Sequence, residues 1–255
     1  MRPLSLFMIC LSLLGASINA QDTLSEQAAR IHDRVWTVDT HVDTPMSLER
    51  GYDLGIRNER GSRRGGLVDF PRMKEGGLDA IFFAIFLGQP RVGAEDYPAA
   101  RAQTLKTFDL IDRELDRLSG LAVRATASQE ALSIEKSGKR AVFIGIENGY
   151  PVGDDPGMVE TFYQRGARYI TLCHTAHNQL CDSSTDSHPP RHNGLSPLGR
   201  QVVAEMNRLG MMVDISHTSD KTVEDVLECS TAPVLASHSS VRAVCDIPRN
   251  LSDPL

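Results

Sequence analysis

Short apolar runs recur along this chain, and most of them are separated by segments with a helical spacing of apolar residues. The runs typical of strands lie near residues 36–43, 79–87, 140–147, 167–174, 210–217 and 232–239. Most are apolar at nearly every position, as in a parallel sheet buried on both faces. Residues 95–119 and 198–209 show the spacing of amphipathic helices. The pattern predicts an α/β fold.

Residues with metal-ligand chemistry end four of these runs. His41 and Asp43 lie two residues apart in the first run, so they project from one face of a strand. Glu147 ends the third run, and His217 and His238 end the last two. Ligands at the C-terminal ends of parallel strands favour a (β/α)8 TIM-type metallohydrolase barrel, of which about six βα units are present in this chain.

These five residues suit a centre of two zinc ions. Imidazoles and carboxylates without thiolate are typical of catalytic zinc, and two-metal sites need a bridging carboxylate. His41 and Asp43 are expected to bind one ion. His217 and His238 are expected to bind the other, with Glu147 as the bridge. In the alternative interpretation, the histidines cap strands through backbone hydrogen bonds. Repetition at four strand ends favours the metal centre.

Two further residues are candidates for contact with a substrate. His174 ends the fourth run, and an imidazole beside a metal centre can hydrogen-bond a carbonyl oxygen or the oxyanion formed from it. Arg249 follows the last run and is a candidate for bidentate binding of a carboxylate, although exposure to solvent is commoner for arginine. The polar segment 175–196 is expected to be a functional loop whose histidines are solvated or structural. The arginine-rich segment 57–64 is expected to be a solvated loop.

Residues 1–20 predict a secretory signal peptide. Arg2 precedes an apolar run over 4–14, and small residues lead to a cleavage site after Ala20. The run is too short to span a bilayer, and no later stretch reaches that length. We therefore expect an exported protein, periplasmic or secreted, with a barrel domain over 21–255. Export would permit disulfides among the four remaining cysteines, but the sequence does not choose a pairing.

The net charge argues against some classes of partner. It is −6 for the whole chain and becomes −7 once Arg2 is removed. A mildly acidic balance argues against nucleic acid as a partner and gives no basic tract for anionic lipid. The oligomeric state stays open, with a homodimer among the options.

Several segments stand in an order shared with a known family. They are Val38–Asp43, Val68–Gly77, Phe143–Gly149, Tyr169–His174, Val213–His217, Ala236–Ser240 and Pro248–Asn250. Together they resemble the membrane (renal-type) dipeptidases, the M19 metallopeptidases. The resemblance implies a (β/α) barrel with a dinuclear zinc centre that hydrolyses dipeptides. It also implies the ligand roles given above, with His174 contacting the substrate and Arg249 holding its terminal carboxylate.

Two departures from the family pattern stand out. Asn148 follows Glu147 where the family often has glycine. The sequence also stops at Leu255, whereas the family pattern continues through two more strands and a late aspartate that assists proton transfer. We therefore expect unpaired sheet edges and little dipeptidase activity from residues 21–255 alone. The alternatives are another metal-dependent amidohydrolase, although those commonly have His-x-His on the first strand, and a non-catalytic truncated chain.

Overall fold

The computed structural model describes residues 24–59, 66–89 and 93–255. Residues 24–37 belong to a small unit of their own, with a helix over 24–32, and the chain from Val38 onward forms a second unit. The predicted signal peptide lies outside the described residues. Within the described residues, no helix is both long enough and apolar enough to cross a membrane.

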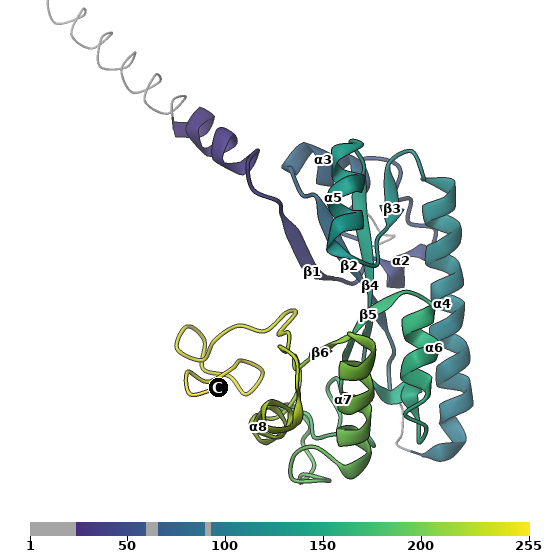
Figure 1. The fold of residues 1–255 in the computed structure, drawn as a ribbon, viewed down its shortest axis with the longest axis vertical. Coiled ribbons are helices and arrows are strands. Elements are labelled where there is room, and N and C mark those ends of the chain that lie inside the picture. Colours follow the sequence, from purple (N-terminus) through teal and green to yellow (C-terminus); the bar gives the residue numbers. More distant parts are fainter. Residues whose placement is uncertain (1–23, 60–65, 90–92) are drawn as a thin grey trace, which may run out of the picture. The chain divides into compact units, whose positions relative to one another are not determined.

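The second unit is built on a parallel sheet (Figure 1). Its strands are β1 (Val38–Val42), β2 (Ala80–Phe86), β3 (Ala122–Arg124), β4 (Arg140–Glu147), β5 (Ala167–Thr171) and β6 (Met212–Asp214). The order is β1-β2-β4-β5-β6, and every pair is parallel. Strand β3 pairs with the first residues of β4. Strand β5 pairs with the later residues of β4 along the same edge. The predicted α/β fold with a parallel sheet is confirmed.

Helices connect the strands. They are α2 (Pro45–Leu48), α3 (Phe70–Gly76), α4 (Tyr97–Arg117), α5 (Ser128–Lys136), α6 (Met158–Gln164), α7 (Pro197–Leu209) and α8 (Asp220–Cys229), with 3₁₀ turns η1 (Ala94–Asp96) and η2 (Tyr150–Val152). Figure 1 shows α4, α6 and α7 on one side of the sheet. Helix α4 packs on β2 and β3, and α6 packs on β5 and α7. The helices predicted over 95–119 and 198–209 are α4 and α7.

Both ends of helix α7 carry residues that are typical of a helix start and a helix stop. The Ser196 hydroxyl caps the helix by accepting a hydrogen bond from the Gly199 N–H at 2.9 Å, and Pro197 occupies the first turn. Gly210 ends the helix with φ = 76°, a left-handed conformation in which glycine carries no steric cost. These local signals fix where the chain turns into β6.

Two predictions about strands need correction. Residues 232–239 do not form a regular strand: Leu235 makes one parallel bridge to Asp214, and its N–H donates to the Val213 carbonyl at 2.8 Å. Pro233 lacks the N–H that a ladder requires, which limits pairing here. Strand β3 was missed because three residues are too few to show a pattern. The four cysteines of the described residues carry free thiols.

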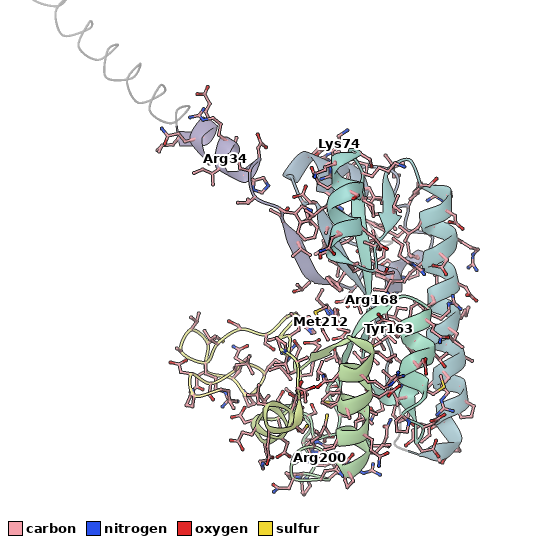
Figure 2. The ribbon with its side chains drawn as sticks, viewed as in Figure 1. Arg34, Lys74, Tyr163, Arg168, Arg200 and Met212 are labelled. Atoms are coloured by element: carbon pink, nitrogen blue, oxygen red, sulfur yellow. The ribbon has the colours of Figure 1, made fainter. Side chains whose placement is uncertain are left out.

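Strand β4 is the centre of the core, and every one of its residues is buried. A Cβ on Gly145 would lie 2.0 Å from the ring of Tyr169, so the missing side chain on β4 makes room for an aromatic ring from β5. The neighbouring Arg168 places its guanidinium 4.2 Å from the centre of the Tyr163 ring, which ties α6 to β5 (Figure 2). The side chain of Tyr169 therefore packs against β4, and the side chain of Arg168 packs against α6.

The contact between Gly145 and Tyr169 generates a stability prediction. Gly145→Ala should lower the free energy of unfolding by about 1–3 kcal/mol, because the added methyl overlaps a ring that has no free space to move into. Gly76→Ala is the matched control, since a Cβ there meets no atom within 4 Å. Urea denaturation measures both. Equal effects of the two substitutions would show that the ring relaxes without cost.

Candidate metal centre

Glu147 is the last residue of β4, is only 3% exposed, and is surrounded by imidazoles. The Nε2 atoms of four histidines lie close to its carboxylate oxygens: His217 at 3.0 Å, His238 at 3.2 Å, His41 at 3.4 Å and His174 at 3.5 Å. These residues come from β1 and from the segments that follow β5, β6 and the bridge at Leu235. The structure therefore brings together residues that are far apart in the sequence. The hydrogen bond from the Thr40 hydroxyl to the Ser237 carbonyl, beside His41 and His238, joins residues 197 positions apart.

The electrostatics of the cluster follow from burial and hydrogen bonding. Burial alone would raise the pKa of Glu147, but hydrogen bonds from His217, His238 and His41 outweigh it and hold that pKa well below its usual range. Burial would lower the pKa of His41, yet its hydrogen bonds to Asp43 and Glu147 raise it to about 9. Glu147 is therefore an anion that its neighbours stabilise.

Two of the other imidazoles are neutral at physiological pH. Burial lowers the pKa of His174 to about 4, and the nearby His217 and Arg249 add to this effect. Burial also lowers the pKa of His217. Neutral imidazoles keep a nitrogen lone pair that can bind a metal ion.

The donor atoms fall into two groups that share one residue. His41, Glu147 and His238 form one group, and Glu147, His174 and His217 form the other, with the ligand atoms of each group within 4.8 Å of one another. Sharing of a carboxylate between two groups is what a dinuclear centre requires, and nitrogen and oxygen donors without thiolate suit zinc. The residues present therefore fit divalent metal ions.

The grouping by distance differs from the grouping that the sequence suggested. His238 lies with His41, their ring centres being 3.7 Å apart, and His174 lies with His217. Asp43 is in neither group: its Oδ1 is 3.2 Å from His41 Nε2, but its side chain is 61% exposed. The assignment of each residue to one ion stays a prediction.

The ring nitrogens of His41 and His238 that face away from Glu147 lie close to hydroxyl groups. His41 Nδ1 lies 3.0 Å from the Tyr169 hydroxyl, and His238 Nδ1 lies 2.7 Å from the Ser237 hydroxyl. His217 Nδ1 is buried and has no hydrogen-bond partner among the described residues. The alternative in which these histidines cap strands through backbone hydrogen bonds does not match this arrangement. Tyr169 and Ser237 are site residues that the sequence interpretation missed.

Arg249 lies beside the cluster and is half-buried. Its Nη1 donates to the Ser239 hydroxyl at 2.6 Å, and its Nη2 donates to the His238 carbonyl at 3.2 Å. Besides burial, its positive charge contributes to the low pKa values of His174 and His217. The guanidinium is thus held next to the histidine that was predicted to contact substrate.

The backbone conformation of Asn148 explains why asparagine can stand where the family often has glycine, directly after Glu147. Its φ is 84°, a left-handed conformation in which glycine is the default and asparagine is tolerated. Its Nδ2 donates to the Leu87 carbonyl at 3.1 Å, and its Oδ1 accepts from the Tyr150 N–H at 3.1 Å. Asn178 also donates to this Oδ1 at 3.1 Å. Asparagine stands in place of glycine here and adds four hydrogen bonds that fix the end of β4, the fourth being from Nδ2 to Gln89 Oε1 at 3.4 Å.

The segment 175–196 is an ordered loop beside the cluster. Asp182 is 1% exposed, and its carboxylate accepts hydrogen bonds from the N–H groups of Arg191, His192 and Gly194. His177 Nδ1 accepts from the Ser183 N–H at 3.0 Å, whereas His188 has an 83% exposed side chain. The loop histidines are therefore structural or solvated, as expected. In the segment 57–64, Arg57 pairs with Glu75, and residues 60–64 lie outside the described part.

The sequence matches one protein family over nearly all of its described length. The model of the membrane dipeptidases, peptidase family M19, matches residues 25–255. The chain belongs to this family. It is 35% identical to dipeptidase tcpJ of Claviceps purpurea over 222 residues, which cover 84% of this chain and 52% of that protein. It is 33% identical to mouse dipeptidase 3 over 244 residues, which cover 91% of this chain and 46% of that protein.

Solved structures of a probable dipeptidase and of a metallopeptidase have a similar fold. The probable dipeptidase PvdM from Pseudomonas aeruginosa matches with a TM-score of 0.79 and 28% identity, over 91% of this chain and 59% of that one. A metallopeptidase from Rhodobacter sphaeroides, solved with a phosphinate mimic of L-Ala-D-Ala, matches with a TM-score of 0.74 and 25% identity, over 86% and 69%. The chain spans about half the length of the curated M19 relatives above. The sheet is thus a partial TIM-type barrel of the M19 dipeptidases.

The left-handed conformation of Asn148 generates a prediction with a built-in control. Asn148→Ala and Asn148→Gly both remove the four side-chain hydrogen bonds, but only alanine carries the steric cost of positive φ. The alanine variant should therefore be less stable than the glycine variant by about 1 kcal/mol in urea denaturation. A glycine variant as unstable as the alanine variant would contradict this explanation.

Proposed function

We propose that the protein is a zinc-dependent dipeptidase that hydrolyses the peptide bond of dipeptides with a free C-terminal carboxylate. One observation carries the proposal: the Glu147 carboxylate is shared by two groups of metal-ligand atoms in a chain that belongs to the M19 family. The similarity to the Rhodobacter metallopeptidase, which was solved with a mimic of a dipeptide, supports this substrate class.

In this proposal Glu147 is the bridging ligand, and His41, Asp43, His217 and His238 complete the coordination of two zinc ions. Bound zinc would supply Lewis acidity toward the scissile carbonyl and would activate water as a nucleophile. The burial of Glu147 supports this role, because a low-dielectric surrounding strengthens its electrostatic interactions. The exposed side of Asp43 leaves room for its carboxylate to turn toward an ion at His41.

His174 and Arg249 are proposed to hold the substrate. A neutral His174 donates a hydrogen bond from one ring nitrogen to the carbonyl oxygen, and it continues to donate as negative charge develops there. Arg249 binds the terminal carboxylate through its guanidinium, which binds a carboxylate in a bidentate geometry. The charge of Arg249 acts on the His174 imidazole, so a short substrate that contacts one residue can contact the other, which favours dipeptides over longer peptides.

We also propose that the protein is exported. The support is the sequence of residues 1–20, where a charged residue, an apolar run and small residues follow in the order of a secretory signal. Mass spectrometry of the mature protein tests this, and an N-terminus at Gln21 is the expected result. A mature protein that retains residues 1–20 would contradict the proposal.

The central test of the function combines two measurements on the full-length protein. Elemental analysis after zinc reconstitution should find two ions per chain. A panel of dipeptides, their amides and longer peptides should show hydrolysis of the free-carboxylate dipeptides that disappears on chelation and returns with zinc. One ion or fewer, or hydrolysis that chelation leaves unchanged, would contradict the proposal.

Comparison of Glu147→Gln with His174→Ala tests the separate roles of these residues. Glu147→Gln should lower the number of bound zinc ions, because it removes the anionic bridge between two groups. His174→Ala should keep both ions and lose catalytic rate. Metal analysis of the two purified variants is the measurement. Equal loss of metal would show that His174 is itself a ligand, as its distance to Glu147 allows.

Arg249→Ala tests the recognition of the substrate carboxylate. It should raise KM for free dipeptides about 10- to 150-fold, which corresponds to the loss of a charge-assisted contact of about 1.5–3 kcal/mol. It should have little effect on KM for dipeptide amides. Arg200→Ala is the matched control, because Arg200 is a surface residue of α7 that pairs with Asp225 and Glu228. If Arg249→Ala affects acids and amides equally, Arg249 does not bind the carboxylate.

A further inference from the structure

Asp214 ends β6 and is completely buried, yet it is not one of the residues that face Glu147. Its carboxylate accepts four hydrogen bonds. Oδ1 accepts from the backbone N–H groups of Ser216 at 3.1 Å and Ser237 at 2.9 Å. Oδ2 accepts from the hydroxyls of Thr171 at 2.5 Å and Ser237 at 2.7 Å. A buried carboxylate with this many donors has a single orientation, so it can fix the groups around it.

The two backbone donors have a particular place in the sequence. Ser216 directly precedes His217, and Ser237 directly precedes His238. Both N–H groups bond to the same oxygen of Asp214, which holds the two histidine segments in register with each other. The register is reinforced by the N–H of His238, which donates to the Ser216 hydroxyl at 3.1 Å. The 2.9 Å separation of the two Nε2 atoms follows from this arrangement.

The Ser237 hydroxyl extends the influence of Asp214 to the His238 ring. A hydroxyl has one hydrogen, and here that hydrogen is donated to Asp214 Oδ2. The Ser237 oxygen can therefore only accept from His238 Nδ1, which lies 2.7 Å away. The His238 ring therefore carries a hydrogen on Nδ1, and Nε2, the atom that faces Glu147 at 3.2 Å, is the nitrogen left for a metal ion, which would replace its hydrogen bond to that carboxylate.

We propose that Asp214 is a positioning residue of the metal centre, which sets the spacing of His217 and His238 and holds, through Ser237, a hydrogen on His238 Nδ1, so that Nε2 is the nitrogen that can bind a metal ion. The inference rests on the proposed function for the identity of the metal, but the hydrogen on Nδ1 is a property of the metal-free protein. Outer residues of this kind fix the orientation of metal-bound imidazoles and raise their basicity.

Asp214→Asn provides a direct test. The amide oxygen of the variant still accepts from the two backbone N–H groups, whereas its NH₂ group donates to the Thr171 and Ser237 hydroxyls. The Ser237 hydrogen is then free to point at His238 Nδ1, which accepts it through its lone pair, so the ring carries its hydrogen on Nε2 alone. Long-range ¹H–¹⁵N correlation spectra of the metal-free protein should show a hydrogen on His238 Nδ1 in the wild type and none there in Asp214→Asn.

Metal affinity gives the second readout. Competition with a chelator should show zinc affinity reduced by about 10- to 100-fold in Asp214→Asn and in Ser237→Ala. Ser237→Thr keeps the hydroxyl and should keep both the hydrogen on His238 Nδ1 and the affinity. Asp69→Asn is the control for loss of a buried carboxylate: Asp69 is 0% exposed and caps α3, so it should lower stability without changing zinc affinity.

The possible outcomes separate the two proposals. A wild-type His238 with no hydrogen on Nδ1, or unchanged affinity in Ser237→Ala, would overturn the role of Asp214. If Asp214→Asn does not fold, the comparison of Ser237→Ala with Ser237→Thr decides the same question. A wild type that has the Nδ1 hydrogen but binds no zinc would instead contradict the proposed function and leave the assigned position of that hydrogen supported.

Discussion

The arrangement of this chain depends on one charge, the carboxylate of Glu147 at the buried end of the central strand. Removing an ion from water costs several kcal/mol, and only a close set of donors or cations offsets it. Four imidazoles supply these partners, and they come from elements spread along the chain. The order of the strands, their parallel direction and the turns at their ends all serve to bring those rings to one carboxylate.

Much of this arrangement could be predicted from the sequence. Strands β2 and β4 are long apolar runs, and the parallel sheet that they imply places all strand ends at one edge, so the meeting of His41, Glu147 and His217 follows from topology alone. Strand β3 and the irregular segment near Leu235 could not be predicted, because three residues or a single bridge leave no periodic signal. The roles of Asp214 and Ser237 were also hidden, because a buried aspartate and a serine look like ordinary strand-end residues until their hydrogen bonds are known.

The backbone around the centre is held in unusual conformations. His217 has φ = 70° and Asn148 has φ = 84°, and left-handed conformations of this kind cost about 1–3 kcal/mol each for residues other than glycine. The loop after β5 holds His217 in place, because the Ser184 N–H donates to the His217 carbonyl at 2.8 Å. The strain is thus located at residues that face or adjoin Glu147, where the surrounding hydrogen bonds are dense enough to maintain it.

The hydrogen bond from the Thr40 hydroxyl to the Ser237 carbonyl joins residues 197 positions apart. Contacts of such long range require a large loop to close before they contribute to stability, so they form late in folding. During synthesis, His41 and Glu147 emerge well before His217 and His238. The early part of the chain therefore passes through a period in which it presents an incomplete set of ligands. If the proposed function holds, a metal ion could find its full set of ligands only after the last histidine has emerged.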